Sequence, residues 1–140
     1  MAMWAGIATQ EQAERMVKEN LLDEKGFWAP YGVRSLSRYE KMYAIKKSGN
    51  PSCWLGPIWG ISNYLVFRGL LRYGFTAEAK ELAEKTVSLF ERDLAQCGQL
   101  HEYYDPETGE PIHNSGFQSW NLLAVNMQAW LNGETIVEEF

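Results

Sequence analysis

Two stretches of this sequence are apolar on almost every side when they are read as helices. Residues 58–73 distribute aromatic and aliphatic side chains around the helix, and Gly74 follows as a C-terminal cap. Residues 118–130 are similarly apolar, with few charges. A helix without a polar face must be buried by several neighbours, which restricts the chain to folds in which helices enclose other helices. The apolar residues are Trp59, Ile61, Tyr64, Leu65, Val66, Phe67, Leu70 and Leu71 in the first stretch, and Trp120, Leu122, Leu123, Ala124, Val125, Met127 and Ala129 in the second.

Two further predicted helices each have a polar face. The first covers residues 10–22, where Thr9 and Gln12 form a capping-box pattern. The other begins after Thr76, the expected N-cap, and ends before Gly98, with an apolar stripe opposite Lys and Glu side chains. Amphipathic and apolar helices therefore alternate along the chain. This order predicts an all-α fold of stacked helical hairpins, in which one layer of helices covers another.

The links between the predicted helices also alternate. A short Gly74-Phe75 turn leads out of the first apolar helix, whereas long loops at residues 26–57 and 98–117 lead into the two apolar helices. Both long loops are therefore expected at the same end of the stack, where a functional site would be assembled.

Two hairpins cannot cover two helices that are apolar all round, because one flank of each would face water. We therefore expect residues 1–140 to be a single unit that forms part of a larger toroid of hairpins. The alternative is a four-helix domain closed on itself, for which the chain is long enough. Self-association through the apolar helices, giving a homo-oligomer, would bury the same surface.

Charge and cysteine content exclude several classes of partner. The net charge is −5, from 13 basic and 18 acidic residues, and no basic stripe is present, so nucleic acid is not an expected partner. The N-terminus lacks a basic region followed by an apolar run, and no stretch reaches membrane-spanning length, so neither export nor membrane contact is expected. Cys53 and Cys97 are isolated thiols without ligand spacing, which fits a reducing cytoplasm.

Aromatic residues make up 14% of the chain, with six Trp, and many lie in polar stretches such as FWAPYGV, CWLGPIW, HEYY and GFQSW. Rings interleaved with amides and carboxylates suit a saccharide, which offers apolar C–H faces and a rim of hydroxyls. The alternative is that the rings fill the core between helices. Trp54 and Trp59 leave both open, as a sugar platform at a helix N-terminus opened by Pro57 or as packing around that N-terminus.

Glu102 is the candidate catalytic residue. It stands between His101 and the pair Tyr103-Tyr104, where partial burial and hydroxyl groups could tune a carboxylate to remove a proton from water. Asp105 and its neighbours, in the sequence DPETGEP, are expected to shape a turn instead.

Other chemistry is not supported by the motifs. His101 and His113 have no obvious third ligand, so no metal site is expected. The chain has neither a GxSxG motif nor a glycine-rich phosphate loop, and no cofactor is expected. Arg34 and Arg38 could hold a carboxylate or a pair of hydroxyls, although loop arginines are more often solvated.

Several segments together resemble the C-terminal part of the catalytic domain of glycoside hydrolase family 63 and its trehalase-like relatives. They are CWLGPIWGISNYLVFRGLLRYGF, HEYYDPETGEP and GFQSW, with WAGIATQEQAERMV and GFWAPYGVRSLS upstream, so the resemblance covers nearly the whole chain. It implies an (α/α)6 toroid of twelve helices, of which this chain would hold about four. It also implies inverting hydrolysis of α-glycosides by a pair of acidic residues.

Within this resemblance, the family's general base falls on Glu102. The aromatic positions around the family's pocket fall on Trp54, Trp59, Phe117 and Trp120, and we add Tyr103 and Arg34 as candidate saccharide contacts. The family often has Arg where this chain has Leu55, which puts that contact in doubt.

The general acid of the family has no counterpart here. Asp23, Asp93 and Asp105 do not occupy its motif. The resemblance therefore implies a C-terminal fragment that carries the base loop and part of the sugar cleft, with little or no activity alone. Saccharide binding without catalysis, and self-association without either, are the alternatives.

Overall fold

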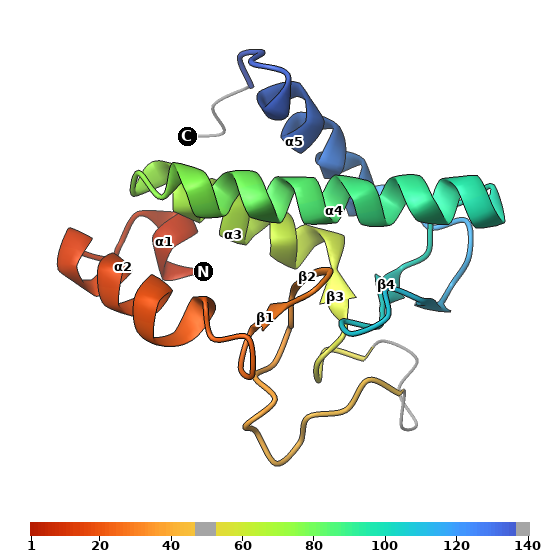
Figure 1. Cartoon of the computed structure of the whole chain (residues 1–140), viewed down its shortest axis with the longest axis horizontal. Coiled ribbons are helices and arrows are strands. Elements are labelled where there is room, and N and C mark those ends of the chain that lie inside the picture. The colour runs from red at the N-terminus through yellow and green to blue at the C-terminus, as the bar shows by residue number, and fades with distance from the viewer. Residues whose placement is uncertain (47–52, 137–140) are drawn as a thin grey trace.

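The computed structural model describes residues 1–46 and 53–136. These residues are mainly helical (Figure 1). The α-helices are α1 (Ala2–Ala5), α2 (Gln10–Met16), α3 (Gly60–Arg72), α4 (Thr76–Cys97) and α5 (Ala124–Leu131). A π-helix, η1 (Val17–Leu21), continues α2, and a 3-10 helix, η2 (Ser119–Leu123), leads into α5. In the described part of the chain, no helix is long and apolar enough to cross a membrane.

Short strands in the long loops correct the all-α prediction. They are β1 (Trp28–Ala29), β2 (Gly32–Val33), β3 (Ile58–Trp59), β4 (Tyr103–Tyr104) and β5 (Pro111–His113). β1 and β2 form one antiparallel hairpin, and β3, β4 and β5 form a second sheet in that order. Strands of two or three residues are too short to show an alternating pattern, so the sequence did not reveal them.

The two long loops meet, which confirms that they lie at the same end of the helices. Strand β3 pairs with β4 in the register Ile58 with Tyr104 and Trp59 with Tyr103. This pairing also corrects the start of the first apolar helix: α3 begins at Gly60, and Pro57 precedes the strand instead of opening the helix.

The core lies between α3 and α4, which pack side by side (Figure 1). Its buried side chains come from α3, α4 and α5, with contributions from the first long loop. They include Tyr64, Phe67, Leu70, Ala79, Leu82, Ala83 and Met127. The hairpin of an apolar helix and an amphipathic helix is therefore the centre of the fold, and α1 packs against α3 from the side of the N-terminus.

The ends of α2 and α4 follow the sequence signals with one exception. Thr9 and Gln12 form the expected capping box, with Gln12 N donating to Thr9 Oγ1 at 3.2 Å and Thr9 N donating to Gln12 Oε1 at 2.9 Å. Gly98 ends α4 in the left-handed conformation, at φ 70°. Thr76, expected as an N-cap, is instead the first residue of α4.

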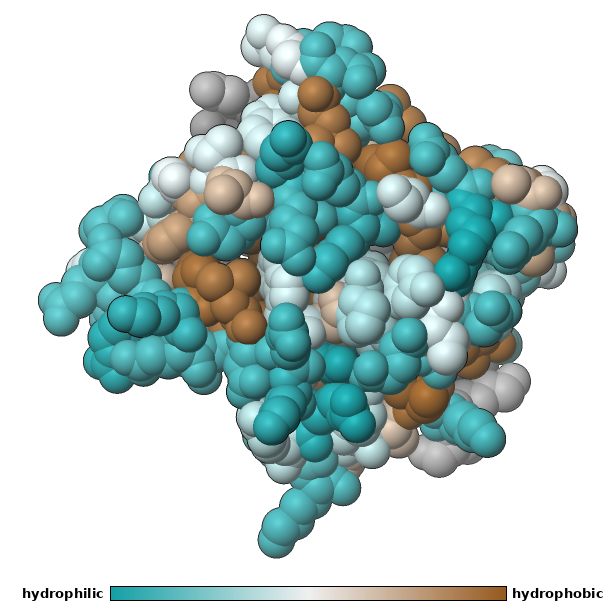
Figure 2. Space-filling view, viewed as in Figure 1, coloured by the Kyte–Doolittle hydropathy of each residue, from teal (hydrophilic) through white to brown (hydrophobic). Residues whose placement is uncertain are grey.

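The C-terminal helical segment, η2 with α5, keeps an apolar flank in solvent. Asn121 and Met127 are buried against the other helices, whereas Leu122 is 56% and Val125 64% exposed. Figure 2 shows apolar surface in this region, above α4. The expected helix over residues 118–130 is thus present, with a 3-10 first part, and its uncovered flank is the one anticipated for a partial toroid.

Candidate functional site

The predicted base, Glu102, lies in the sheet where the two long loops meet. It directly precedes β4, and its backbone N–H donates to the carbonyl of His113 at 3.0 Å. The residue is only 8% exposed, and Asn114 Nδ2 donates to its Oε2 at 3.1 Å. Asn114 adopts a left-handed backbone conformation, φ 53°, which Asn tolerates better than most residues. A turn at the end of β5 therefore aims an amide at the carboxylate.

Five of the predicted saccharide contacts form one group of touching rings, which we call the aromatic cluster: Trp54, Trp59, Tyr103, Phe117 and Trp120. Trp54 and Trp59 stack with ring centroids 3.7 Å apart, at an interplanar angle of 8°. Tyr103 stacks on Trp59 at 4.9 Å, Trp120 lies 6.1 Å from Trp59, and Phe117 lies 5.0 Å from Trp120. The rings come from both long loops and from η2, so the fold gathers them from three segments.

Burial divides the aromatic cluster into a core and an accessible edge. Trp59 is fully buried, and its Nε1–H donates to the carbonyl of Cys53 at 2.9 Å. Trp54 is 43% exposed and covers it. The packing interpretation applies to Trp59, whereas the ring of Trp54 is stacked on it and accessible to solvent.

Tyr103 joins the aromatic cluster to the carboxylate. Burial, followed by the nearby Cys53 and Glu102, raises the pKa of the Tyr103 hydroxyl. The raised pKa keeps the phenol protonated to a higher pH than that of an ordinary tyrosine.

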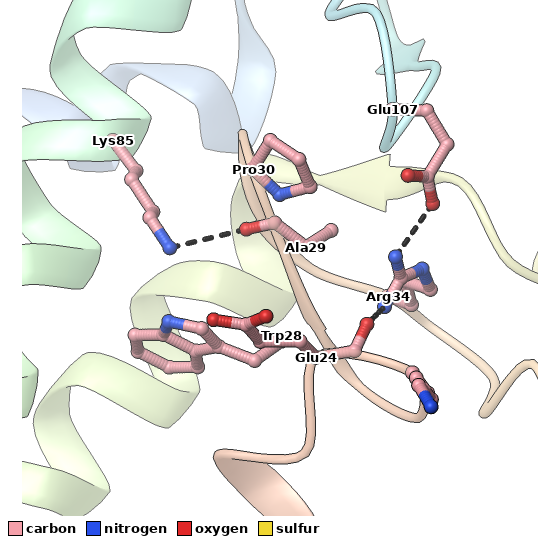
Figure 3. A pocket seen from close by; sticks show the side chains of 8 residues that line it. Glu24, Trp28, Ala29, Pro30, Arg34, Lys85 and Glu107 are labelled. Carbon is pink, nitrogen blue, oxygen red and sulfur yellow. Dashed lines mark hydrogen bonds and ion pairs between the residues drawn. The ribbon is translucent and has the colours of Figure 1, made fainter.

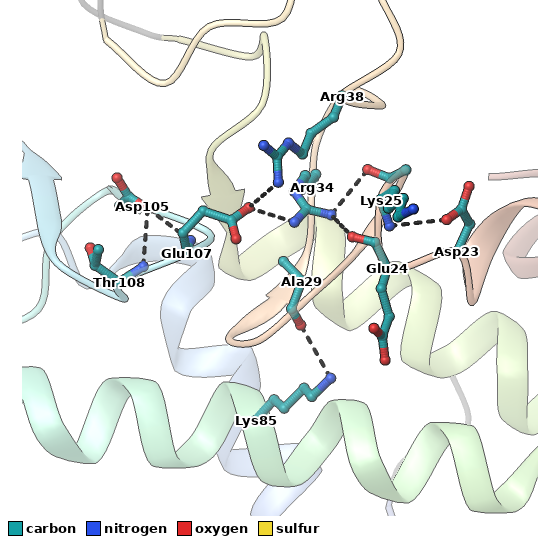
Figure 4. Close-up of polar contacts among 11 residues, drawn as sticks. Asp23, Glu24, Lys25, Ala29, Arg34, Arg38, Lys85, Asp105, Glu107 and Thr108 are labelled. Carbon is teal, nitrogen blue, oxygen red and sulfur yellow. Dashed lines mark hydrogen bonds and ion pairs between the residues drawn. The ribbon is translucent and has the colours of Figure 1, made fainter.

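Arg34, the remaining predicted contact, is engaged elsewhere. Its guanidinium is buried, donates from Nη1 to the carbonyls of Glu24 (2.9 Å) and Gly26 (3.1 Å), and pairs through Nη2 with Glu107 (Figure 4). Arg38 contacts the same Glu107 oxygen at 3.3 Å. Arg34 thus does hold a carboxylate, but one from this chain, and the ion pair ties the first long loop to the second.

Arg34 and Glu107 also line a cavity of about 330 Å³ beside α4 (Figure 3). Its other lining residues are Glu24, Lys25, Trp28, Ala29, Pro30 and Lys85. Lys85 donates to the carbonyl of Ala29 at 3.1 Å and lies 4.6 Å from the centre of the Trp28 ring. Arg34, Glu107 and Lys85 are thus all engaged in contacts within the chain.

The turn after β4 is shaped as expected. Asp105 Oδ1 accepts from the backbone N–H of Glu107 at 2.8 Å and of Thr108 at 3.1 Å, which is an Asx turn. Asp105 therefore fixes the conformation of the loop that presents Glu107 to Arg34.

The sequence analysis missed the residues that hold the loop below Glu102. The buried carboxylate of Asp93, on α4, accepts from His101 N at 3.0 Å and from the Tyr104 hydroxyl at 2.8 Å. Asn121 Nδ2 donates to the carbonyl of His101 at 2.7 Å. The backbone of His101, directly before Glu102, is thus fixed from α4 and η2, and Asp93 also holds the side chain of Tyr104. Asp93 lies within α4, whereas His101 lies eight residues later, beyond the end of that helix. No local sequence pattern therefore predicts the contact between them.

This chain is similar in sequence to known glycoside hydrolases. A mannosylglycerate hydrolase MGH1-like glycoside hydrolase domain matches residues 1–121. Mannosylglycerate hydrolase MGH1 of Selaginella moellendorffii is 32% identical over 133 residues, which are 94% of this chain and 24% of that protein. A probable mannosyl-oligosaccharide glucosidase of Schizosaccharomyces pombe is 30% identical over 117 residues, 76% of this chain and 14% of that protein.

A solved structure gives the same result in three dimensions. The family 63 mannosylglycerate hydrolase from Thermus thermophilus, in complex with glucose, is similar with a TM-score of 0.70 and 29% identity, over 89% of this chain and 28% of that chain. Fold and sequence thus define part of an (α/α)6 glycoside hydrolase domain. The chain belongs to the mannosylglycerate hydrolase MGH1-like glycoside hydrolase domain family. It spans about a quarter or less of the length of these curated relatives.

Proposed function

We propose that this chain is the base-bearing segment of an inverting α-glycosidase domain and that Glu102 activates the attacking water. The observation that carries the proposal is the position of Glu102: a nearly buried carboxylate held by an amide, next in sequence to Tyr103, which stacks in the aromatic cluster. A partly desolvated carboxylate beside a platform of rings is the arrangement that proton abstraction next to a bound sugar requires.

In this mechanism, Glu102 takes a proton from water as the water oxygen attacks the anomeric carbon. The bond from that carbon to the leaving oxygen breaks, and the leaving oxygen takes a proton from a general acid. In inverting enzymes the two carboxyl groups stand about 6.5–9.5 Å apart, with the water between the base and the sugar.

In this proposal, the acid comes from outside this chain. The family resemblance implies an acid on an earlier hairpin, and the three aspartates of this chain considered for that role have structural contacts instead. Asp23 accepts from Lys25 N at 3.0 Å, Asp93 holds His101 and Tyr104, and Asp105 closes its own turn. We therefore expect little or no hydrolysis by this chain alone.

The aromatic cluster would contact the saccharide through the exposed face of Trp54. Rings stacked at 3.7 Å form a rigid support, so little side-chain entropy is lost when a sugar packs on it. Leu55 provides no charged donor where the family often has Arg, so binding should rely on stacking and be weak.

Two measurements on the pure chain test the proposal. Titration calorimetry with glucose, mannose, trehalose and glucosylglycerate should show weak binding to at least one sugar, reduced in Trp54→Ala and retained in Trp54→Phe. If all four sugars at millimolar concentration gave only the heat of dilution, the proposed saccharide binding would be ruled out. The chain should also be assayed with α-glucosides and α-mannosides. Turnover that is lost in Glu102→Gln but kept in Glu110→Gln would contradict the expectation that this chain lacks the general acid.

The exposed flank of η2 and α5 favours a second candidate role, self-association. Leu122 and Val125 are among the most exposed large apolar side chains of the described residues, and closing this flank would bury them. Light scattering over a range of concentrations should then show an oligomer that Leu122→Lys with Val125→Lys dissociates. A folded monomer at all concentrations would leave this role without support.

A further inference from the structure

The C-terminal end of α4 brings together three side chains that the proposed glycosidase mechanism does not use. Asp93, Cys97 and His101 each place one ligand atom within 4.8 Å of the other two. We propose that these residues bind a divalent transition-metal ion of the zinc class. The expectation of no metal rested on the pair His101 and His113, whereas the structure groups His101 with α4.

The helix and its cap produce this grouping. Asp93 and Cys97 are four residues apart on α4, so their side chains lie on one face of the helix. Gly98 ends the helix in the left-handed conformation and turns the chain, after which His101 N donates to Asp93 at 3.0 Å. The positions of the three groups are therefore fixed by a rigid helix end and by a backbone hydrogen bond.

The charges at this helix end favour a cation. The Asp93 side chain is 2% exposed, and His101 Nδ1, at 2.9 Å, is its ion-pair partner in the described part of the chain. No basic residue stands in the last turn of α4, where the free carbonyl groups carry the negative end of the helix dipole. A bound metal ion would add positive charge beside this nearly buried carboxylate and the negative helix end.

The donor set selects the class of metal. One thiolate, one imidazole and one carboxylate match the ligands of tetrahedral Zn²⁺, whereas Mg²⁺ and Ca²⁺ take oxygen ligands. Cys97 is exposed, so solvent can provide the fourth ligand. Binding would release the thiol proton to water, and modest side-chain movement would bring the three donors to bonding distance.

The surroundings of the three residues resemble the outer shell of a metal site. The Tyr104 hydroxyl donates to Asp93 Oδ2 at 2.8 Å, which orients the carboxylate. Asn121 holds the His101 carbonyl at 2.7 Å. Since His101 directly precedes Glu102, a metal here would stiffen the base of the loop that carries the proposed catalytic carboxylate, without itself touching a saccharide.

Metal titration of the reduced full chain tests the site. Co²⁺ should bind with a stoichiometry of one and give the sulfur-to-cobalt charge-transfer band and the strong visible bands of tetrahedral coordination. Zn²⁺ should displace it and raise the melting temperature. Cys97→Ser should abolish the charge-transfer band and weaken Zn²⁺ binding by at least about tenfold.

Matched variants separate the possible outcomes. Cys53→Ser and His113→Gln should bind as the wild type does, and so should Glu102→Gln, which makes failure of the metal site distinguishable from failure of the glycosidase proposal. His101→Gln should lose binding. Zn²⁺ affinity unchanged in Cys97→Ser, octahedral Co²⁺ spectra, or no metal retained after dialysis would overturn the proposal and leave a hydrogen-bonded His–Asp pair only.

Discussion

Helices α3 and α5 have similarly apolar sequences, yet they lie in very different surroundings. Tyr64, Phe67 and Leu70 of α3 are almost completely buried, because α1, α4 and η2 pack around that helix. In the η2–α5 segment, Leu122 and Val125 remain mostly exposed. An apolar helix pattern thus indicates the need for neighbours, and the fold decides whether they are present.

The two helices differ in the neighbours that this chain provides for them. The similar mannosylglycerate hydrolase from Thermus thermophilus is more than three times longer than the part that matches this chain, since the match covers 28% of it. The α3–α4 hairpin carries its main partners in its own sequence. The η2–α5 segment packs on α3 and α4, and Leu122 and Val125 on its other side remain mostly exposed among the described residues.

Truncation of matched apolar residues should show the largest effect of this difference. Phe67→Ala removes a fully buried ring from the core, and we expect it to lower the free energy of unfolding by about 3–5 kcal/mol. Leu122→Ala removes a mostly exposed side chain and should cost less than about 0.5 kcal/mol. Urea denaturation of both variants measures the contrast. Equal losses would mean that the C-terminal flank is covered in solution.

A buried amide in α3 should give the next largest effect. Asn63 Oδ1 accepts from Val33 N at 3.0 Å, and its Nδ2 donates to Thr86 Oγ1 at 3.0 Å, so it links α3 to β2 and α4. Gly32 lies so close that a Cβ there would stand 2.3 Å from Asn63 Nδ2. Asn63→Ala should cost about 1–3 kcal/mol, because partner groups would be left buried and unpaired.

Asn126 of α5 provides the matched control for Asn63. Its Nδ2 donates to the Tyr64 hydroxyl at 3.2 Å, and Asn126 itself is only partly buried, whereas Asn63 is fully buried. Asn126→Ala should therefore destabilise the chain less in the same urea experiment. The comparison of the two helices would fail if the Asn126 variant lost as much stability as the Asn63 variant.

The buried Tyr104 hydroxyl should make the stability of the packed region depend on pH in the alkaline range. Burial raises the pKa of Tyr104 well above its usual range, so the folded state disfavours the phenolate. The protonated hydroxyl contributes fully to stability below the pKa of tyrosine in the unfolded chain, about 10. This contribution is lost as the pH rises toward the higher pKa of Tyr104 in the folded protein. Tyr104→Phe should cost about 1 kcal/mol at neutral pH by removing the bond to Asp93, and should flatten the alkaline decline.

Tyr39→Phe is the control for this titration. Tyr39 is exposed, although the neighbouring Asp23 also raises its pKa, so its replacement should change the alkaline branch much less. Stability curves from chemical denaturation between neutral pH and about pH 11 would compare the two variants. Identical alkaline branches in wild type and Tyr104→Phe would refute the proposed burial effect.

Local patterns in the sequence identified most of the helices, and contacts between distant segments account for what they missed. Periodicity and caps located α2, α3 and α4, since both depend on residues within a few positions. The sheet of β3, β4 and β5 joins segments about forty residues apart through two- and three-residue strands, which no pattern of period two can reveal.

The candidate site divides in the same way. The five rings of the aromatic cluster, chosen for their chemistry and family motif, do meet in space, and Glu102 directly precedes one of them, Tyr103, in the sequence. The groups that hold the site, Asp93, Asn114 and Asn121, were not predicted, because a structural hydrogen bond has no characteristic sequence. Arg34 was predicted to hold a carboxylate or a pair of hydroxyls, and the structure pairs it with a carboxylate of the same chain, Glu107.

The smallest expected effect lies on the outer face of α4, where the packed region meets solvent. Glu81 accepts from Trp28 Nε1 at 2.9 Å and pairs with Lys85 at 2.7 Å, and Lys85 is the main cause of its lowered pKa. A carboxyl group whose pKa is lowered in the folded state stabilises the fold at pH values above its ordinary pKa. This stabilisation is lost as the pH falls through the folded pKa.

The Glu81 side chain is 52% exposed, so Glu81→Gln should cost only about 0.2–1 kcal/mol near neutral pH. The difference between the variant and the wild type should shrink as the pH drops below about 4, whereas Glu84→Gln, whose partner Lys80 is largely exposed, should show less change at any pH. A Glu81 variant as stable as the wild type at neutral pH would show that Trp28 is held by packing and by Lys85, and not by this carboxylate.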